Sequence, residues 1–233
     1  MNRTIGVFKM HARDKWSWIW IPWIICLSSF LINVLIGYIL SFQQQSEEFY
    51  TGGLFSMVVY VFVLGILTPP QTFLYALGMG VRRTDYFLGT AMMALLFSVG
   101  SSILLLLLSW MEAGTNHWGL GLHFFKLPFL SEGMVLAQGL TFMVLLLSVY
   151  FDGLLIASVY RKFGRLGSLL FFGVLLLIFL IAPLWITYLE GWDDIGRWLV
   201  DNFRSMNDVT PWLLVKTLIF ALASYWLLLR ATV

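Results

Sequence analysis

The chain alternates between long apolar runs and short polar interruptions. A helix needs about 20 apolar residues to cross the hydrocarbon core of a bilayer, because each residue adds about 1.5 Å across about 30 Å. Six runs reach or nearly reach that length, so the pattern predicts six transmembrane helices. These spans cover residues 18–40, 53–75, 86–110, 133–160, 167–188 and 211–229.

The second run is the least regular, because Pro69 and Pro70 interrupt it. Proline lacks a backbone donor and clashes with the preceding helical turn. We therefore expect a bend at this point, after which the helix resumes toward the inner surface.

Two further segments have amphipathic rather than spanning patterns. Residues 1–16 mix apolar side chains with lysines and arginines, which predicts an N-terminal elbow lying on the inner, anionic leaflet. Between spans five and six, four apolar residues recur at helical spacing, which predicts an outer interfacial helix. These four are Ile195, Trp198, Leu199 and Phe203. An irregular, aromatic-rich loop is the alternative for this second segment.

Composition supports the membrane assignment. Hydrophobic residues make up 60% of the 233 positions and charged residues 11%, whereas soluble domains average about 45–50% and about 25%. So few charges cannot cover a water-facing surface of this size. We therefore expect an all-α, polytopic membrane protein in which residues 1–233 form a single transmembrane domain.

The distribution of basic residues predicts the orientation of the chain. With six spans and an inner N-terminus, ten of the 14 lysines and arginines fall on the inner side. They are Arg3, Lys9, Arg13, Lys15, Arg82, Arg83, Arg161, Lys162, Arg165 and Arg230. The outer segments hold Lys126, Arg197 and Arg204, and Lys216 is ambiguous. Both termini are therefore expected inside.

Several kinds of chemistry have no motif in this sequence. No lysine follows a glycine, which excludes a G-x-x-x-x-G-K-[ST] phosphate loop. His11, His117 and His123 show no metal-ligand spacing, and Cys26 is the only cysteine. No G-x-S-x-G motif occurs either. We expect no enzymatic activity, no metal site and no cofactor on this chain.

Three polar residues inside the predicted spans are candidates for specific contacts. Asp152 is the only acid among them. It provides a polar contact in a cavity or with the partner subunit, or it pairs with Arg161 or Lys162 near the inner interface. Asn33 and Gln138 are uncharged and are expected to form hydrogen bonds between helices.

The stretch LGMGVRRTDYFLGT, residues 77–90, interrupts the apolar pattern between spans two and three. Its arginines could be a topology signal that reaches lipid phosphates. However, glycines at positions 78 and 80 permit a tight turn that ends the helix, and Thr84 or Asp85 could cap the next one. The stretch then forms a short, rigid, basic turn at the inner face.

This topology and loop resemble those of the ABC-2 type permeases, the membrane subunits of ATP-binding cassette exporters. The family loop has a glycine, a small or polar residue, one or two basic residues, and an aromatic or aliphatic pair before a second glycine. The matching residues are Gly80, Val81, Arg82, Arg83, Tyr86, Phe87, Leu88 and Gly89. Val81 stands where the family often has serine or threonine.

The resemblance implies a function and a set of partners. Residues 76–86 would be the coupling loop that docks on an ATPase, with contacts from Gly80, Val81, Arg82, Arg83, Thr84, Asp85 and Tyr86. Two ATP-binding subunits would carry ATP and Mg, and a second permease chain would complete the path. The expected location is the bacterial cytoplasmic membrane, with no nucleic-acid partner. The expected substrate is hydrophobic or amphipathic: a lipid-like molecule, a peptide or an antibiotic.

Other classes of protein remain open on the sequence alone. An ion-coupled secondary transporter or a channel would also be rich in apolar helices. A non-transporting assembly or immunity factor, or an intramembrane enzyme, are further alternatives. The sequence determines neither the substrate nor the choice between a homodimer and a heterodimer.

Overall fold

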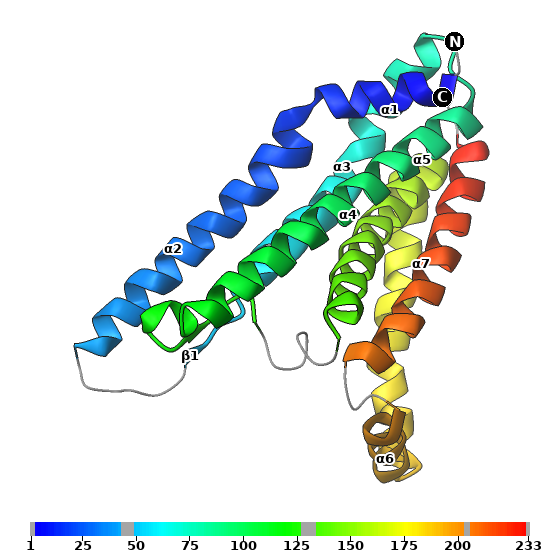
Figure 1. Ribbon diagram of the computed structural model, residues 1–233. Coiled ribbons are helices and arrows are strands. Elements are labelled where there is room, and N and C mark those ends of the chain that lie inside the picture. Colours follow the sequence, from blue (N-terminus) through cyan, green and yellow to red (C-terminus); the bar gives the residue numbers. More distant parts are fainter. Residues whose placement is uncertain (1–2, 43–48, 127–133, 203–205, 232–233) are drawn as a thin grey trace.

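The computed structural model describes residues 3–42, 49–126, 134–202 and 206–231, and these are almost entirely helical (Figure 1). The helices are α1 (Arg3–Arg13), the π-helix η1 (Trp16–Trp20), α2 (Ile21–Ser41), α3 (Phe55–Gly78), α4 (Arg83–Gly114), the 3-10 turn η2 (His117–Gly119), α5 (Val135–Tyr188), α6 (Trp192–Asn202) and α7 (Met206–Leu229). Two short strands, β1 (Phe49–Tyr50) and β2 (Leu122–His123), pair in parallel.

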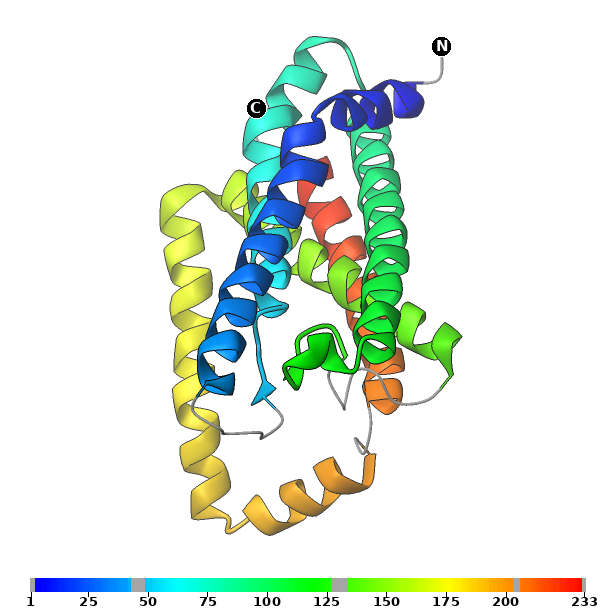
Figure 2. The same cartoon turned by 60° about the vertical axis from the view of Figure 1, so that its left-hand side comes forward.

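Within the described ranges, five helices are long and apolar enough to cross a membrane. This confirms the all-α prediction and is compatible with a membrane protein. It does not confirm six spans, because the predicted fourth and fifth spans lie in one assigned helix, α5. That helix contains a non-helical residue, Gly164, with φ 68° and ψ −166°. Figures 1 and 2 show the chain turning back there, which divides α5 into two arms.

The elements segregate to two ends of the bundle (Figure 1). One end carries both termini, α1 and the turn between α3 and α4, and the first arm of α5 runs toward it. The other end carries β1, the end of α4 and α6. The elements that hold the ten predicted inner basic residues therefore gather at one end.

The closest helix contact joins α3 to the first arm of α5. A Cβ atom on Gly65 would overlap the carbonyl oxygen of Tyr150, and one on Gly153 would overlap the carbonyl oxygen of Phe62. Because backbone rather than side chain fills the space, only glycine fits at either position. The two helices therefore approach nearly to backbone contact.

We expect Gly153→Ala to destabilise the protein by about 1–3 kcal/mol, since overpacking here must move a helix backbone. Thermal unfolding in detergent would measure this. Gly100→Ala is the matched control, because Gly100 is also inside a helix but a Cβ there would meet no atom within 4 Å. Equal melting temperatures for the two variants would contradict the expected contact.

The buried core lies among η1, α3, α4 and the first arm of α5. Trp18 is 2% exposed and packs its ring 6.1 Å from Phe97 and 5.5 Å from Tyr150. The second arm of α5 is different, because its most apolar stretch has no buried residue. Leu169, Phe179 and Leu184 are each at least 70% exposed. This arm presents apolar surface on all sides, which suits contact with lipid or another chain.

Several helix boundaries differ from the predicted ones. α3 continues through Pro69 and Pro70 to Gly78, so it extends beyond the predicted span end at residue 75. α7 begins at Met206, ahead of the predicted start at residue 211. The N-cap of α4 is Arg82, without a side-chain cap, so the prediction that Thr84 or Asp85 caps this helix is wrong. Both residues instead lie inside its first turn.

Candidate functional sites

The turn between α3 and α4 is short and tightly hydrogen-bonded. The amide of Gly80 donates to the carbonyl of Leu77 over 2.9 Å, and that of Val81 donates to Ala76 over 3.1 Å. Gly80 has φ 76°, a left-handed conformation that glycine adopts without a steric penalty. The predicted coupling segment is therefore a rigid turn joining two long helices, and residues 76–78 still belong to α3.

The two arginines of this segment have different environments. Arg83 points to α7, where its Nη1 donates to the carbonyl of Leu229 over 2.7 Å. Asp85 Oδ1 accepts a hydrogen bond of 3.0 Å from the Thr4 hydroxyl of α1. Arg82, in contrast, is exposed. Arg83 and Asp85 therefore anchor the turn to neighbouring helices, and Arg82 is its outward-facing charge.

Only part of the predicted coupling set is accessible. Gly80 and Arg82 are exposed, whereas Val81, Arg83, Thr84 and Asp85 are half-buried. Tyr86 is fully buried within the chain, and its predicted contact with a partner stays a prediction. Its ring packs 5.1 Å from Phe73.

A chain of hydroxyl groups continues from Tyr86 into the bundle. The Tyr86 hydroxyl lies 2.7 Å from the Thr72 hydroxyl, and Tyr150 of α5 donates to the Thr68 hydroxyl over 3.3 Å. Hydrogen bonds between buried hydroxyls help to hold helices in a fixed arrangement. These bonds connect α4 to α3, and α3 to the first arm of α5.

Helix α1 packs directly on α4. Gly89 provides the space, because a Cβ atom there would lie 2.6 Å from Val7 Cβ. His11 is 2% exposed, and its Nε2 lies 3.0 Å from the Thr90 hydroxyl. Burial lowers the pKa of His11 to about 4, so the imidazole is neutral near pH 7. The predicted N-terminal elbow is thus a helix fixed to α4, and its place on a leaflet stays a prediction.

Asp152 pairs with a residue that sequence reasoning did not assign to it. Lys216 Nζ of α7 lies 2.8 Å from Asp152 Oδ2. The predicted pairing with Arg161 or Lys162 is therefore wrong, because the first arm of α5 packs along α7 and turns this carboxylate toward it. The side chains of Lys216 and Asp152 are 36% and 25% exposed. The pair lies well inside two apolar helices, where charges are costly and usually functional.

The predicted polar contact of Asn33 is local. Asn33 accepts a 2.8 Å hydrogen bond from the Thr51 hydroxyl and donates to the Ser29 carbonyl. It ties α2 to the segment after β1, rather than to another helix as predicted. Gln138 is half-buried in the first turn of α5.

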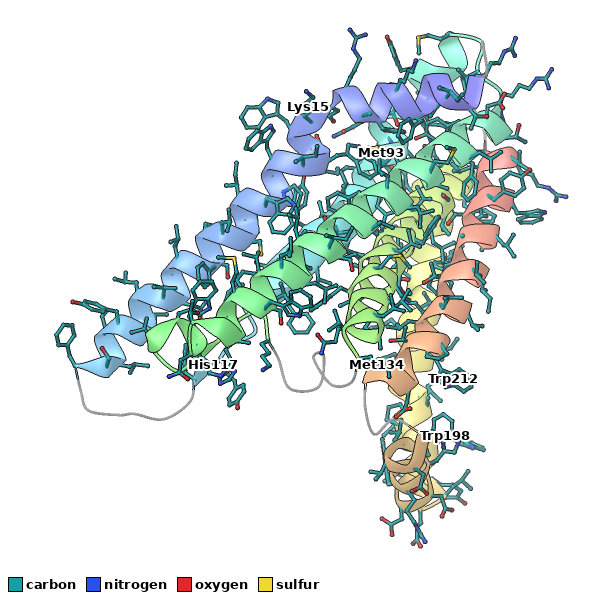
Figure 3. All side chains as sticks on the ribbon, in the orientation of Figure 1. Lys15, Met93, His117, Met134, Trp198 and Trp212 are labelled. Carbon is teal, nitrogen blue, oxygen red and sulfur yellow. The ribbon has the colours of Figure 1, made fainter. Side chains whose placement is uncertain are left out.

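A helix is present where the outer interfacial helix was expected. α6 includes Ile195, Trp198 and Leu199, and Trp198 is half exposed (Figure 3). Phe203 lies outside the described residues. Arg197 Nη2 lies 3.5 Å from Asp194 on the exposed face. Whether this helix lies at a membrane surface stays a prediction.

Sequence reasoning missed one cluster entirely. Glu112, near the end of α4, lies 3.9 Å from the Nδ1 atoms of both His117 and His123 (Figure 3 labels His117). These three residues could together hold a metal ion. The three residues come from α4, η2 and β2, and their spacing in the sequence matches no common metal-binding motif. Two histidines and an acid lie close together in the sequence here, and this proximity could have indicated the cluster.

Comparisons of the chain with protein-family models, with curated proteins and with solved structures find no match. The structure therefore defines only a broad class of protein: a helical chain with several helices long and apolar enough to cross a membrane.

Proposed function

We propose that this chain is the membrane-spanning permease subunit of an ABC exporter. The observation that carries the proposal is the α3–α4 turn. Its exposed Gly80 and Arg82 project from the end of the bundle that holds both termini, while Arg83 and Asp85 anchor it to α7 and α1. A rigid, basic, outward-facing turn suits docking into a socket on a separate ATPase.

In the proposed mechanism, the ATPase binds this turn and moves the helices through it. ATP and Mg would bind to two copies of the ATPase, whose closure moves the turn. Because α1, α3, α4 and α7 all meet near it, the movement would bias the whole bundle between two states. With the two arms of α5 counted as separate crossings, both termini and this turn would lie on the same side of the membrane, and the basic residues gathered there favour the inner side.

A second permease chain, identical or not, is expected to complete the translocation path. The second arm of α5 supports this, because the residues of its most apolar stretch are not buried within the described part of the chain. The substrate would be hydrophobic or amphipathic, since the described surface of the bundle is mostly apolar. A bacterial cytoplasmic membrane is the proposed location.

An ion-coupled transporter is the second candidate function. The Asp152–Lys216 pair favours it, because ion-coupled transporters carry ionisable groups within their membrane helices. The exporter proposal accounts for the α3–α4 turn, whereas an ion-coupled transporter would not need it.

Copurification tests the exporter proposal. The chain, extracted in mild detergent from its native membrane, should bring with it a phosphate-loop ATPase whose activity rises in the presence of this chain. Transport that follows an ion gradient and persists without nucleotide would instead support the second candidate.

A further inference from the structure

We propose that Glu112, His117 and His123 form a binding site for Zn²⁺ or a similar first-row divalent metal. The site lies at the end of the bundle opposite the termini, and no part of the exporter proposal requires it. Each residue offers one ligand atom, and these atoms all lie within 4.8 Å of one another.

Glu112 carries a buried negative charge in an unfavourable position. Its side chain is 0% exposed, and it lies in the last turn of α4, where the helix dipole is negative. A buried carboxylate needs a compensating cation or a full set of hydrogen bonds. Four hydrogen bonds stabilise this carboxylate, and a cation beside Glu112 would stabilise it further.

The hydrogen bonds to Glu112 leave one oxygen directed at the histidines. Oε2 accepts from the amides of Phe124 and Phe125, over 3.2 and 2.7 Å, and from the Trp118 indole over 3.4 Å. Oε1 accepts from one amide, that of Lys126, over 3.2 Å. Oε1 is also the atom that lies 3.9 Å from each imidazole. The carboxylate is thus oriented as a metal ligand commonly is, with outer groups holding the second oxygen.

The two imidazoles lie against each other beside this oxygen, with their ring planes tilted by 40°. Their ring centroids are 3.8 Å apart. His123 is fixed by β2 and stacks on Tyr50 of β1 at 4.4 Å. A shared metal ion satisfies both rings in their neutral form.

His117 reaches the site only through a strained turn. Asn116, His117 and Trp118 have φ of 52°, 56° and 63°, a left-handed run that is costly for residues other than glycine. The His117 Nδ1 atom is buried without a hydrogen-bond partner among the described residues. Strain of this kind is typical of functional positions. A metal would use the unsatisfied nitrogen that the strained turn directs to Glu112.

The ligand set and distances fit zinc. Bonds of about 2.0–2.2 Å in tetrahedral geometry place neighbouring ligand atoms about 3.3 Å apart. The 3.9 Å separations would shorten by about half an ångström when an ion binds. Imidazole and carboxylate suit zinc and its first-row neighbours better than Mg²⁺ or Ca²⁺. The side chain of His117 is 24% exposed, so solvent reaches this ligand, and a water is the expected fourth one.

The test measures binding of Zn²⁺ and Co²⁺ to the full chain, purified in detergent without a polyhistidine tag. We expect one ion per chain and, with Co²⁺, the visible absorption of a tetrahedral site. His117→Asn should weaken binding at least about tenfold, because loss of a direct ligand costs no less than loss of an outer-shell group. Asparagine tolerates the left-handed conformation at this position, so this variant should remain folded.

Glu190→Gln is the matched control, since it removes an exposed acid elsewhere in the chain and should leave binding unchanged. Circular dichroism and the elution volume of each variant would report folding independently of metal. Binding that is absent in the wild-type chain, or equal in the wild type and His117→Asn, would overturn the proposal.

Discussion

Replacing Arg82 with glutamate is expected to reduce ATPase stimulation by this chain about tenfold or more while leaving the bundle folded. Arg82 is exposed on the α3–α4 turn, so its substitution breaks no described internal contact. In the proposed complex it faces acidic or carbonyl groups of the ATPase. Reversing its charge would replace attraction with repulsion, which costs several kcal/mol when like charges meet at an interface. The readouts are ATP hydrolysis and export in reconstituted vesicles.

Arg165→Glu is the control for this experiment. Arg165 is also exposed and follows the Gly164 break in α5, but it lies outside the α3–α4 turn. Arg165→Glu makes the same change of charge, so it tests whether loss of an inner positive charge is by itself enough to reduce ATPase stimulation. If Arg82→Glu stimulates the ATPase as the wild type does, Arg82 is not a docking residue. If both variants lose stimulation equally, the loss of an inner positive charge alone is responsible.

Arg83 should not be used as a substitute for Arg82 in this test. Its guanidinium is bonded to the Leu229 carbonyl at the end of α7. A glutamate there would lose that hydrogen bond and place a negative charge beside a helix C-terminus, where it is unfavourable. A double Arg82 and Arg83 variant would therefore mix a docking defect with a folding defect.

Most of the helices could be predicted from the sequence, because apolar runs of spanning length have few other stable structures. The two-arm geometry of α5 could be anticipated as separate spans, since charged residues cluster around Gly164. The boundaries were less predictable. Pro69, Pro70 and Pro211 all lie inside helices, because neighbouring helices stabilise the structure around the backbone groups that proline leaves unpaired.

The sites were harder to predict because they depend on which helices become neighbours. Lys216 and Asp152 are far apart in sequence and meet only because α7 packs along the first arm of α5. The turn at Gly80 was predictable, since its glycine and arginines are contiguous. The burial of Tyr86 was not, because it results from packing against Phe73 of α3 and the adjacent α1.

We expect a second large effect from breaking the Asp152–Lys216 ion pair. Asp152→Asn should lower the free energy of unfolding by about 2–3 kcal/mol, because it leaves the Lys216 ammonium without its carboxylate among apolar helices. A fully buried pair would lose about 3–5 kcal/mol. The smaller figure applies here because the two side chains are 36% and 25% exposed.

Removing both charges separates stability from transport. The double variant Asp152→Asn with Lys216→Met should recover stability to within about 1 kcal/mol of the wild type, since neither charge is then stranded. A double-mutant cycle in mixed micelles measures this coupling, and additive losses would show that the pair does not interact.

The double variant also tests the function. In an ATP-driven exporter it should retain transport, because the energy comes from the ATPase. In an ion-coupled transporter it should lose transport while remaining stable, since the titratable groups themselves would carry the coupling. The same variant therefore distinguishes the two candidate functions in a fully folded protein.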